Sequence, residues 1–129
     1  METPLEMPEL VSMQDDYARL RMTGEYTFEA VITKVDDTIR WCHENGIKRL
    51  LADGRGLTGF PPPNVMQRFE FATRWAESAR GLVAVAFVSP PELIDVEQIG
   101  MTMAQNRGMN TAVFTEVSDA VAWIEDLPA

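Results

Sequence analysis

The residues best suited to chemistry lie in one glycine-rich segment, Asp53-Gly54-Arg55-Gly56-Leu57-Thr58-Gly59. Its glycines let the backbone approach a ligand closely and adopt left-handed turns. Arg55 offers a planar cation to a carboxylate or phosphate, and Asp53 offers an acceptor. The segment lacks the Gly-Lys-Ser/Thr ending of a phosphate-binding P-loop. It is therefore a candidate contact loop for an anion or a partner, or else a long turn in which Asp53 binds backbone donors and Arg55 is solvated.

The sequence offers little for nucleophilic, acid–base or metal catalysis. The one cysteine and the one histidine, Cys42 and His43, are neighbours on an expected helix, about 100° apart, and cannot form a thiolate–imidazole pair. Asp36-Asp37, Glu25 and Glu29 are interpreted as a solvated face. There is no Gly-x-Ser-x-Gly motif and no metal-ligand spacing. We expect no catalytic residue, no metal and no cofactor.

A helix expected from Asn64 to about Ala79 carries two apolar stripes. The stripe assigned to the core comprises Val65, Phe69, Ala72, Ala76 and Ala79. The second comprises Arg68, Phe71 and Trp75, offset by a quarter turn or more. An exposed Phe-Trp pair beside an arginine is typical of protein interfaces. The same side chains could instead line an apolar pocket or lie beneath a neighbouring loop such as the triple proline.

Methionines and one further tryptophan are weaker candidates. Met66, Met101, Met103 and Met109 could form a soft apolar cluster that adapts to a ligand, although ordinary core packing is the more common role. Trp41 falls on the predicted solvent side of its helix. We expect it to lie across that helix surface, with a second contact point as the alternative.

Hydrophobic periodicity and turn residues define the elements that position these side chains. In chain order, the expected elements are strands at 9–14 and 17–23, a helix at 26–45, a strand at 47–52, a helix at 64–79, a strand at 82–88, a helix from 90 to about 107, a strand at 109–115 and a last helix. The expected caps are Thr27, Asn64-x-x-Gln67, Ser89-Pro90-Pro91-Glu92 and Thr115. Right-handed crossovers then predict a five-stranded, mixed, mainly parallel sheet with helices on both faces.

Length and charge narrow the class of protein. The 129 residues suit one domain, expected at 9–129 after a flexible acidic tail at 1–8. Twenty acidic residues against eleven basic ones give a net charge of −9, which argues against nucleic-acid binding. No apolar run is long enough to span a membrane, and no signal peptide is recognisable. We expect a cytoplasmic protein.

Four local stretches, in this order, resemble one known family. They are Gly24-Glu25-Tyr26-Thr27, Leu50-Leu51-Ala52-Asp53, Asn106-Arg107-Gly108 ahead of Val113-Phe114, and Ala120-x-x-Trp123. Over residues 9–127 the chain resembles the STAS family, and more closely a SpoIIAA-like branch of small bacterial proteins. The fold of that branch is also similar to CRAL-TRIO lipid-binding domains.

The resemblance implies a regulatory or interaction domain without catalysis. In anti-sigma-factor antagonists a phosphorylated Ser or Thr follows the acidic position that Asp53 matches. Here Gly54 and Arg55 stand in its place, and Thr58 comes three residues late, so the usual phosphorylation switch is not expected.

Two hypotheses follow. The first is a non-enzymatic domain that binds a protein partner or a second copy of itself through residues 53–58, including Gly56, and the Arg68, Phe71 and Trp75 stripe. The alternative is a carrier of a small apolar or lipid-like anion between the second and third helices. Arg55 would then meet the head group, and the cavity would be lined by Met66, Phe69 and Met103.

Overall fold

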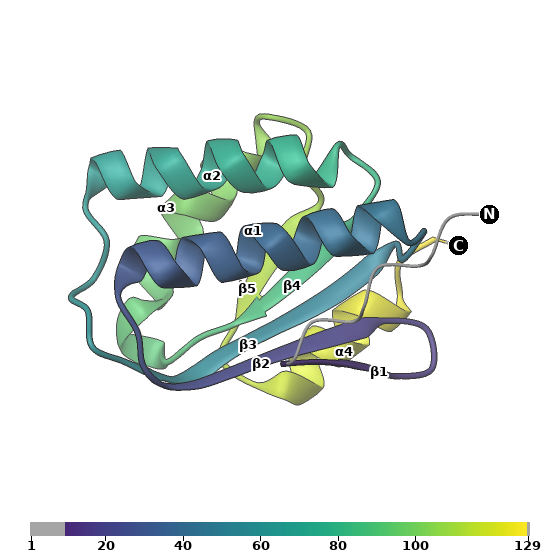
Figure 1. Ribbon diagram of the computed structural model, residues 1–129, viewed down its shortest axis with the longest axis horizontal. Coiled ribbons are helices and arrows are strands. Elements are labelled where there is room, and N and C mark those ends of the chain that lie inside the picture. Colours follow the sequence, from purple (N-terminus) through teal and green to yellow (C-terminus); the bar gives the residue numbers. More distant parts are fainter. Residues whose placement is uncertain (1–9, 129) are drawn as a thin grey trace.

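A five-stranded mixed sheet forms the centre of the molecule, in the spatial order β1-β2-β3-β4-β5 (Figure 1). The strands are β1 (Val11–Met13), β2 (Ala18–Glu25), β3 (Arg49–Thr58), β4 (Ala84–Val88) and β5 (Thr111–Phe114). β1 and β2 form the predicted antiparallel hairpin, and β2 to β5 run parallel. This computed structural model describes residues 10–128, without the side chains of residues 94–97. The predicted tail at 1–8, Glu9 and Ala129 lie outside the described residues.

Helices connect the parallel strands and cover both faces of the sheet. They are α1 (Phe28–Glu44), α2 (Val65–Ala79), α3 (Ile94–Gln105) and α4 (Val117–Glu125), with a 3-10 turn η1 (Pro91–Leu93) ahead of α3. In Figure 1, α1 lies in front of the sheet and α4 behind it. The predicted α/β class, the five-stranded mixed sheet and the four helices are confirmed. No helix within residues 10–128 is long and apolar enough to cross a membrane.

The caps of α1 and α2 are those predicted. Thr27 Oγ1 accepts a hydrogen bond from the Ala30 N–H at 3.1 Å. The Asn64 side chain accepts from the Gln67 N–H at 2.8 Å, and the Gln67 side chain accepts from the Asn64 N–H at 2.9 Å. Both helices therefore begin where their sequences provide acceptors for otherwise unpaired amides.

The starts of α3 and α4 differ from the prediction. Because Pro90 and Pro91 lack amide protons, the chain first makes a tight turn in which the Leu93 N–H donates to the Pro90 carbonyl at 3.0 Å. The α-helix then begins with Leu93 as its N-cap, later than the capping-box pattern indicates. In α4, Glu116 rather than Thr115 is the N-cap, and no side chain caps the helix there.

The glycine-rich segment predicted as a loop is the second half of β3. Pairing with β2 continues to Thr58, which lies opposite Glu25, after an irregularity in register between Arg21 and Thr23. Gly56 lies opposite Thr23, where an added Cβ would come within 2.8 Å of the threonine Cγ2. This glycine therefore permits close strand pairing, and the predicted loop is wrong because β2 supplies a partner that the local sequence does not reveal.

The side chains of the sheet divide between two hydrophobic clusters. Leu50 and Ala52 of β3 belong to the larger one, beneath α1, α2 and α3. Leu51, between them, packs with Ala120 and Ile124 of α4. Successive residues of a strand point to opposite faces, so this division fixes the direction of every side chain along β3 up to Arg55.

Gly100 in α3 allows α3 to pack closely on α2. A Cβ at Gly100 would lie 2.2 Å from Phe71 Cζ, inside contact distance. Gly→Ala within a helix usually stabilises by about 1 kcal/mol. Here we expect Gly100→Ala to destabilise by about 1–3 kcal/mol, because the Phe71 ring must move within a packed core. Chemical denaturation measures the effect, and a more stable variant would contradict this packing.

Candidate functional site

A small apolar pocket lies between the sheet and the three helices α1, α2 and α3. Its volume is about 70 Å³. It lies where β4 stops at Val88 while β3 continues past it. Ligands in open α/β sheets tend to bind at the carboxyl ends of parallel strands, and this pocket is in that position. It is the strongest candidate site in the described part of the chain.

Aromatic rings make up much of the wall. Phe71 and Trp75 of α2 have ring centroids 4.7 Å apart, and Trp75 stacks on Phe87 of β4 at 4.9 Å. The ring centroid of Phe28 in α1 lies 5.5 Å from that of Phe60, which follows β3. The aliphatic part of the lining includes Leu20, Met22, Val31, Val35, Ala52, Leu57, Val88 and Met101. An apolar cavity of this kind holds water poorly and favours apolar groups.

Phe71 and Trp75 are therefore not an exposed stripe. Their exposed fractions are 2% and 6%, whereas Val65 and Phe69, assigned to the core from the sequence, are 61% and 48% exposed. The buried face of α2 comprises Phe71, Ala72, Trp75, Ala76 and Ala79. Residues of both predicted stripes share this face, because the alanines leave room for the two large rings. The predicted protein-binding surface is wrong at these two aromatic residues.

Arg68 also differs from its predicted role. Its Nε donates to the Pro63 carbonyl at 3.2 Å, so the half-buried side chain ties α2 to the triple-proline segment. That segment borders the pocket through Phe60 and Pro63. Arg68 thus supports one wall of the pocket and is not grouped with Phe71 and Trp75 on a surface.

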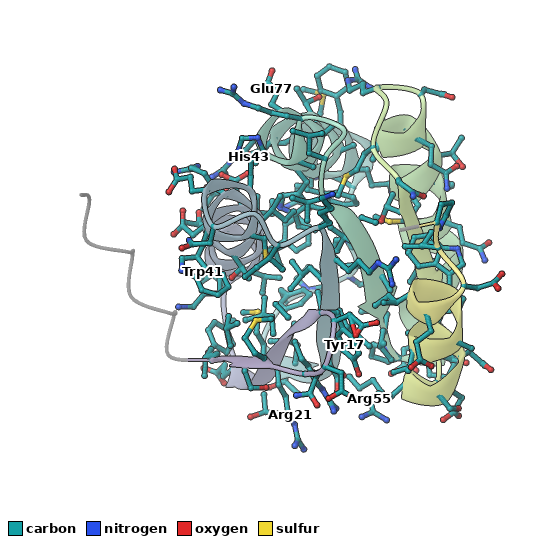
Figure 2. The ribbon with its side chains drawn as sticks, turned by 90° about the vertical axis from the view of Figure 1, so that its right-hand side faces the viewer. Tyr17, Arg21, Trp41, His43, Arg55 and Glu77 are labelled. Carbon is teal, nitrogen blue, oxygen red and sulfur yellow. The ribbon has the colours of Figure 1, made fainter. Side chains whose placement is uncertain are left out.

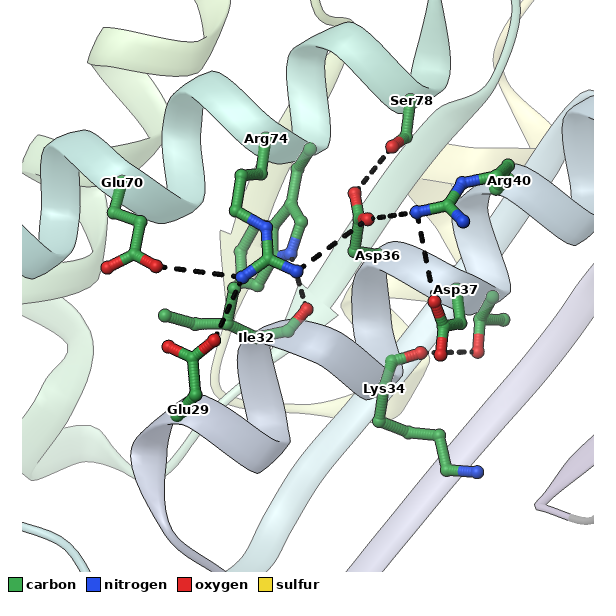
Figure 3. Close-up of polar contacts among 11 residues, drawn as sticks. Glu29, Ile32, Lys34, Asp36, Asp37, Arg40, Glu70, Arg74 and Ser78 are labelled. Atoms are coloured by element: carbon green, nitrogen blue, oxygen red, sulfur yellow. Dashed lines mark hydrogen bonds and ion pairs between the residues drawn. The ribbon is translucent and has the colours of Figure 1, made fainter.

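A charged network fastens α1 to α2 (Figure 3). Asp36 is only 3% exposed and accepts hydrogen bonds from Ser78 and from Arg40. Arg74 lies 3.9 Å from Asp36 and 3.1 Å from Glu29. Asp36 was predicted to lie on a solvated face, and this is wrong. The signal in the sequence was its place beside Val35 and Ile39 on the apolar side of α1.

Trp75 adds a polar contact to the same pair of helices. Its Nε1–H donates to the Ile32 carbonyl at 3.1 Å in a buried position. The hydrogen bond and the charged network together fix the separation of α1 and α2. They therefore set the width of the pocket.

Asp53 is part of the pocket lining and Arg55 is not, and the charged groups of both are directed away from the pocket. Ala52 faces α1, so the alternation along β3 directs the side chains of Asp53 and Arg55 to the α4 side. Arg55 Nε and Nη2 donate to the two Asp53 oxygens, each at 3.0 Å, and Arg19 Nη2 donates at 3.3 Å. The predicted pairing of Arg55 with the head group of a ligand in this pocket is therefore wrong.

The pKa of Asp53 is shifted by this environment. Burial alone would raise it, but the hydrogen bonds and positive charge of Arg55, with the hydrogen bond from Arg19, outweigh burial and hold the pKa below its usual value. Asp53 is therefore ionised at neutral pH and acts as the anchor of two arginines.

The other predicted site residues lie at the pocket wall or on the surface. Gly54 lines the pocket. Thr58 is exposed at the end of β3, and its carbonyl accepts from the Tyr26 N–H at 2.9 Å. Met66 is 74% exposed. Met66, Phe69 and Met103 do not line the pocket, whereas Met101 does, so the predicted lining is wrong at those three residues. Met66 and Phe69 instead border a shallow hollow on the surface of α2.

Trp41 and Cys42 of α1 belong to the larger core, and His43 beside them is half-buried. Cys42 is fully buried, and burial raises the pKa of its thiol to about 12, so it is not a nucleophile at neutral pH. Trp41 is 9% exposed and belongs to the larger core, which corrects its predicted place on the solvent side. Across residues 10–128, no three His, Cys, Asp or Glu side chains are placed to hold a metal.

Comparison with protein-family models finds no match, and no curated protein matches the chain. Among solved structures, the chain is similar to an uncharacterized protein of the DUF3478 family from Shewanella loihica PV-4, described as having a SpoIIAA-like fold. The two are 17% identical, the match covers 88% of this chain and 90% of that one, and the TM-score is 0.48. The fold named is the one the sequence resemblance implies. The likeness concerns the fold and not the function.

Proposed function

We propose that this protein is a non-enzymatic binding domain for a small apolar molecule, or for the end of an alkyl chain. The observation that carries the proposal is the aromatic-lined pocket at the carboxyl ends of β3 and β4. Leaving about 70 Å³ of apolar space empty costs about 2 kcal/mol, from roughly 24 cal/mol per Å³ of cavity. An apolar ligand that fills this space recovers much of that free energy.

The size of the pocket limits the ligand. Pockets for drug-sized molecules span roughly 300–1,000 Å³, so this one accepts only a few carbon atoms in its present form. A longer chain would leave through the mouth, which is bordered by the half-buried Leu57, Phe60, Pro90 and Leu93. The pocket thus suits a chain end better than a bulky ring system.

The lining also limits the charge of the ligand. Of the described residues that form it, none is a lysine or an arginine, and the Asp53 carboxylate is held on the other face. A neutral chain therefore fits better than the anion expected from the sequence. We expect octanol to bind at least as well as octanoate.

A series of n-alkanols tests this function. Each methylene that enters the pocket contributes about 0.8 kcal/mol, so affinity should rise about fourfold per carbon. It should level off once the chain reaches the mouth. Quenching of tryptophan fluorescence measures the affinities, since Trp75 lies in the wall. Absence of saturable binding, or a rise that continues without levelling off, would contradict a bounded pocket.

The outer face of α2 favours a second candidate function, which is binding to a protein partner or a second copy. Val65, Met66 and Phe69 are 48% to 74% exposed there, and Arg107 lies 4.9 Å from the centre of the Phe69 ring. Apolar side chains grouped in this way are typical of contact surfaces. Native mass spectrometry of untreated protein tests it: a dimer that is lost in Phe69→Ser supports this function, and a monomer excludes self-association.

A further inference from the structure

A group of arginines lies on the face of the sheet opposite the pocket. Tyr17 and Leu51 pack in the cluster beneath α4. Because side chains alternate along a strand, every second residue of β2 and β3, counted from Tyr17 and Leu51, also faces α4. These residues include Arg19, Arg21, Arg49 and Arg55. Figure 2 looks along the sheet and shows Arg21 and Arg55 extending from its lower edge, on the side away from α1 and α2.

The charge of this face is opposite to that of the whole chain. The protein has a net charge of −9 and only eleven basic residues, four of which are on this face. Arg49 is occupied, because it donates to the Leu127 and Pro128 carbonyls and lies 3.8 Å from Asp16. Of the three remaining arginines, Arg19 and Arg55 contact the buried carboxylate of Asp53, and Arg21 lies opposite Asp53 in the strand pairing.

Asp53 sets the arrangement of these arginines. It holds Arg55 by two side-chain hydrogen bonds and Arg19 by one. Arg21 is the direct neighbour of Asp53 in the pairing of β2 with β3, and within residues 10–128 it makes no ion pair. The three guanidinium groups outnumber the carboxylates of Asp53 and of Glu116, which borders Arg55, by one, so an excess of positive charge stays at the surface.

Two of the three arginines can reach a ligand. Arg21 is exposed, and the Arg55 side chain is 42% exposed. Arg19 lies behind them, and its Nε is buried without a hydrogen-bond partner. Arg55 keeps an Nη1 that Asp53 does not use, and Arg21 keeps its whole planar group. The guanidinium fork matches the oxygens of phosphate in a way that a lysine does not.

We propose that Arg21 and Arg55 bind a phosphate group, with Arg19 and Asp53 as the positioning residues behind them. A phosphate anion complements the local excess of positive charge, and its tetrahedral oxygens can accept from the Arg21 fork and from Arg55 Nη1 at once. Glu116, the N-cap of α4, is the acidic group that borders Arg55 and limits the site on that side. The site and the apolar pocket lie on opposite faces of the sheet and share only Asp53, whose carboxylate is directed to the arginines.

Inorganic phosphate is the first probe, followed through amide chemical shifts in phosphate-free buffer. We expect saturable shifts along β2 and β3 around Arg21 and Arg55. Arg21→Gln and Arg55→Gln should each weaken binding about tenfold, since each removes a charged hydrogen bond. Arg21→Lys should fall between wild type and Arg21→Gln, because it keeps the charge and loses the fork.

The matched control is Arg80→Gln, which removes an exposed arginine at the end of α2 and should leave phosphate binding unchanged. An equal loss in this control would overturn the proposal, because the effect would then follow net charge. Shifts confined to another region, or binding unaffected by Arg21→Gln and Arg55→Gln, would overturn it as well.

The phosphate could belong to a soluble monoester or to a lipid head group. Phosphatidylcholine vesicles with and without phosphatidate distinguish the two sources. Arginine-dependent recruitment to the phosphatidate vesicles assigns a head group, and phosphate binding without such recruitment assigns a soluble ligand. Failure of both arms rejects the site. Alkanol binding tests the apolar pocket and does not depend on these arginines. A failure of the phosphate site can therefore be distinguished from a failure of the proposed function.

Discussion

Trp75→Ala is expected to destabilise the domain by about 3–5 kcal/mol, the range for removing a large buried aromatic residue. The indole stacks on Phe87, packs against the tilted Phe71 ring and donates its N–H to the Ile32 carbonyl. Its loss enlarges a space that is already partly empty and removes the buried hydrogen bond from the indole to the Ile32 carbonyl. Equilibrium denaturation in urea measures the change in the free energy of unfolding. If the wild type is stable by only a few kcal/mol, the variant will be largely unfolded.

The same substitution at another tryptophan is the control. Trp123 on α4 is half-buried and contacts Phe114 at 6.1 Å, so Trp123→Ala should cost clearly less. If Trp75→Ala keeps the stability of the wild type and instead weakens association with a partner, Trp75 is a surface residue. That result would restore the interface that the sequence predicts.

Removal of the Asp53 side chain is the second large effect. Asp53→Ala leaves Arg19 and Arg55 without the carboxylate that orders them. Breaking a buried ion pair costs about 3–5 kcal/mol. We expect about 2–3 kcal/mol here, because Arg55 is 42% exposed and regains water. Asp37→Ala, on a side chain that is 58% exposed, is the matched control and should change stability by less than about 0.5 kcal/mol.

The contribution of Asp53 should depend on pH in a defined direction. Its folded pKa is below the unfolded value of about 3.9, so the folded state binds its proton less readily. The stabilisation is complete above that unfolded value and is lost as the pH falls through the folded pKa. The difference in stability between wild type and Asp53→Asn should therefore shrink below about pH 4. A difference that stays constant would show that Asp53 carries no shifted pKa.

The fold was largely predictable because its signals are local. The apolar stretch of β4 predicted a strand covered on both faces, and all five of its residues are buried. The capping pattern of Asn64 and Gln67 predicted the residue at which α2 begins, and Asn64 is its N-cap. The extent of β3 was not predictable in the same way. It depends on a partner strand about thirty residues away, and Gly56 has a turn-like local sequence.

The site was harder to predict because it depends on which helices and strands pack against each face of a helix. α2 packs against α1 on one side and α3 on another, so a single hydrophobic stripe does not describe it. The choice between Phe69 and Phe71 depended on Gly100, whose missing side chain makes room for the Phe71 ring. Asp36 is buried because Arg40, Arg74 and Ser78 converge on it from two helices. Only the tertiary arrangement brings those groups together.

The affinity of octanol for Ala52→Val is the most direct test of the proposed pocket. Ala52 lies in the pocket wall, and valine suits a strand while filling part of the space. Ala112→Val, on β5 outside the pocket lining, is the matched control. If the pocket is the binding site, Ala52→Val stays folded and binds octanol about tenfold more weakly or worse, while Ala112→Val binds as the wild type does. Equal octanol affinity in all three proteins would contradict binding in this pocket.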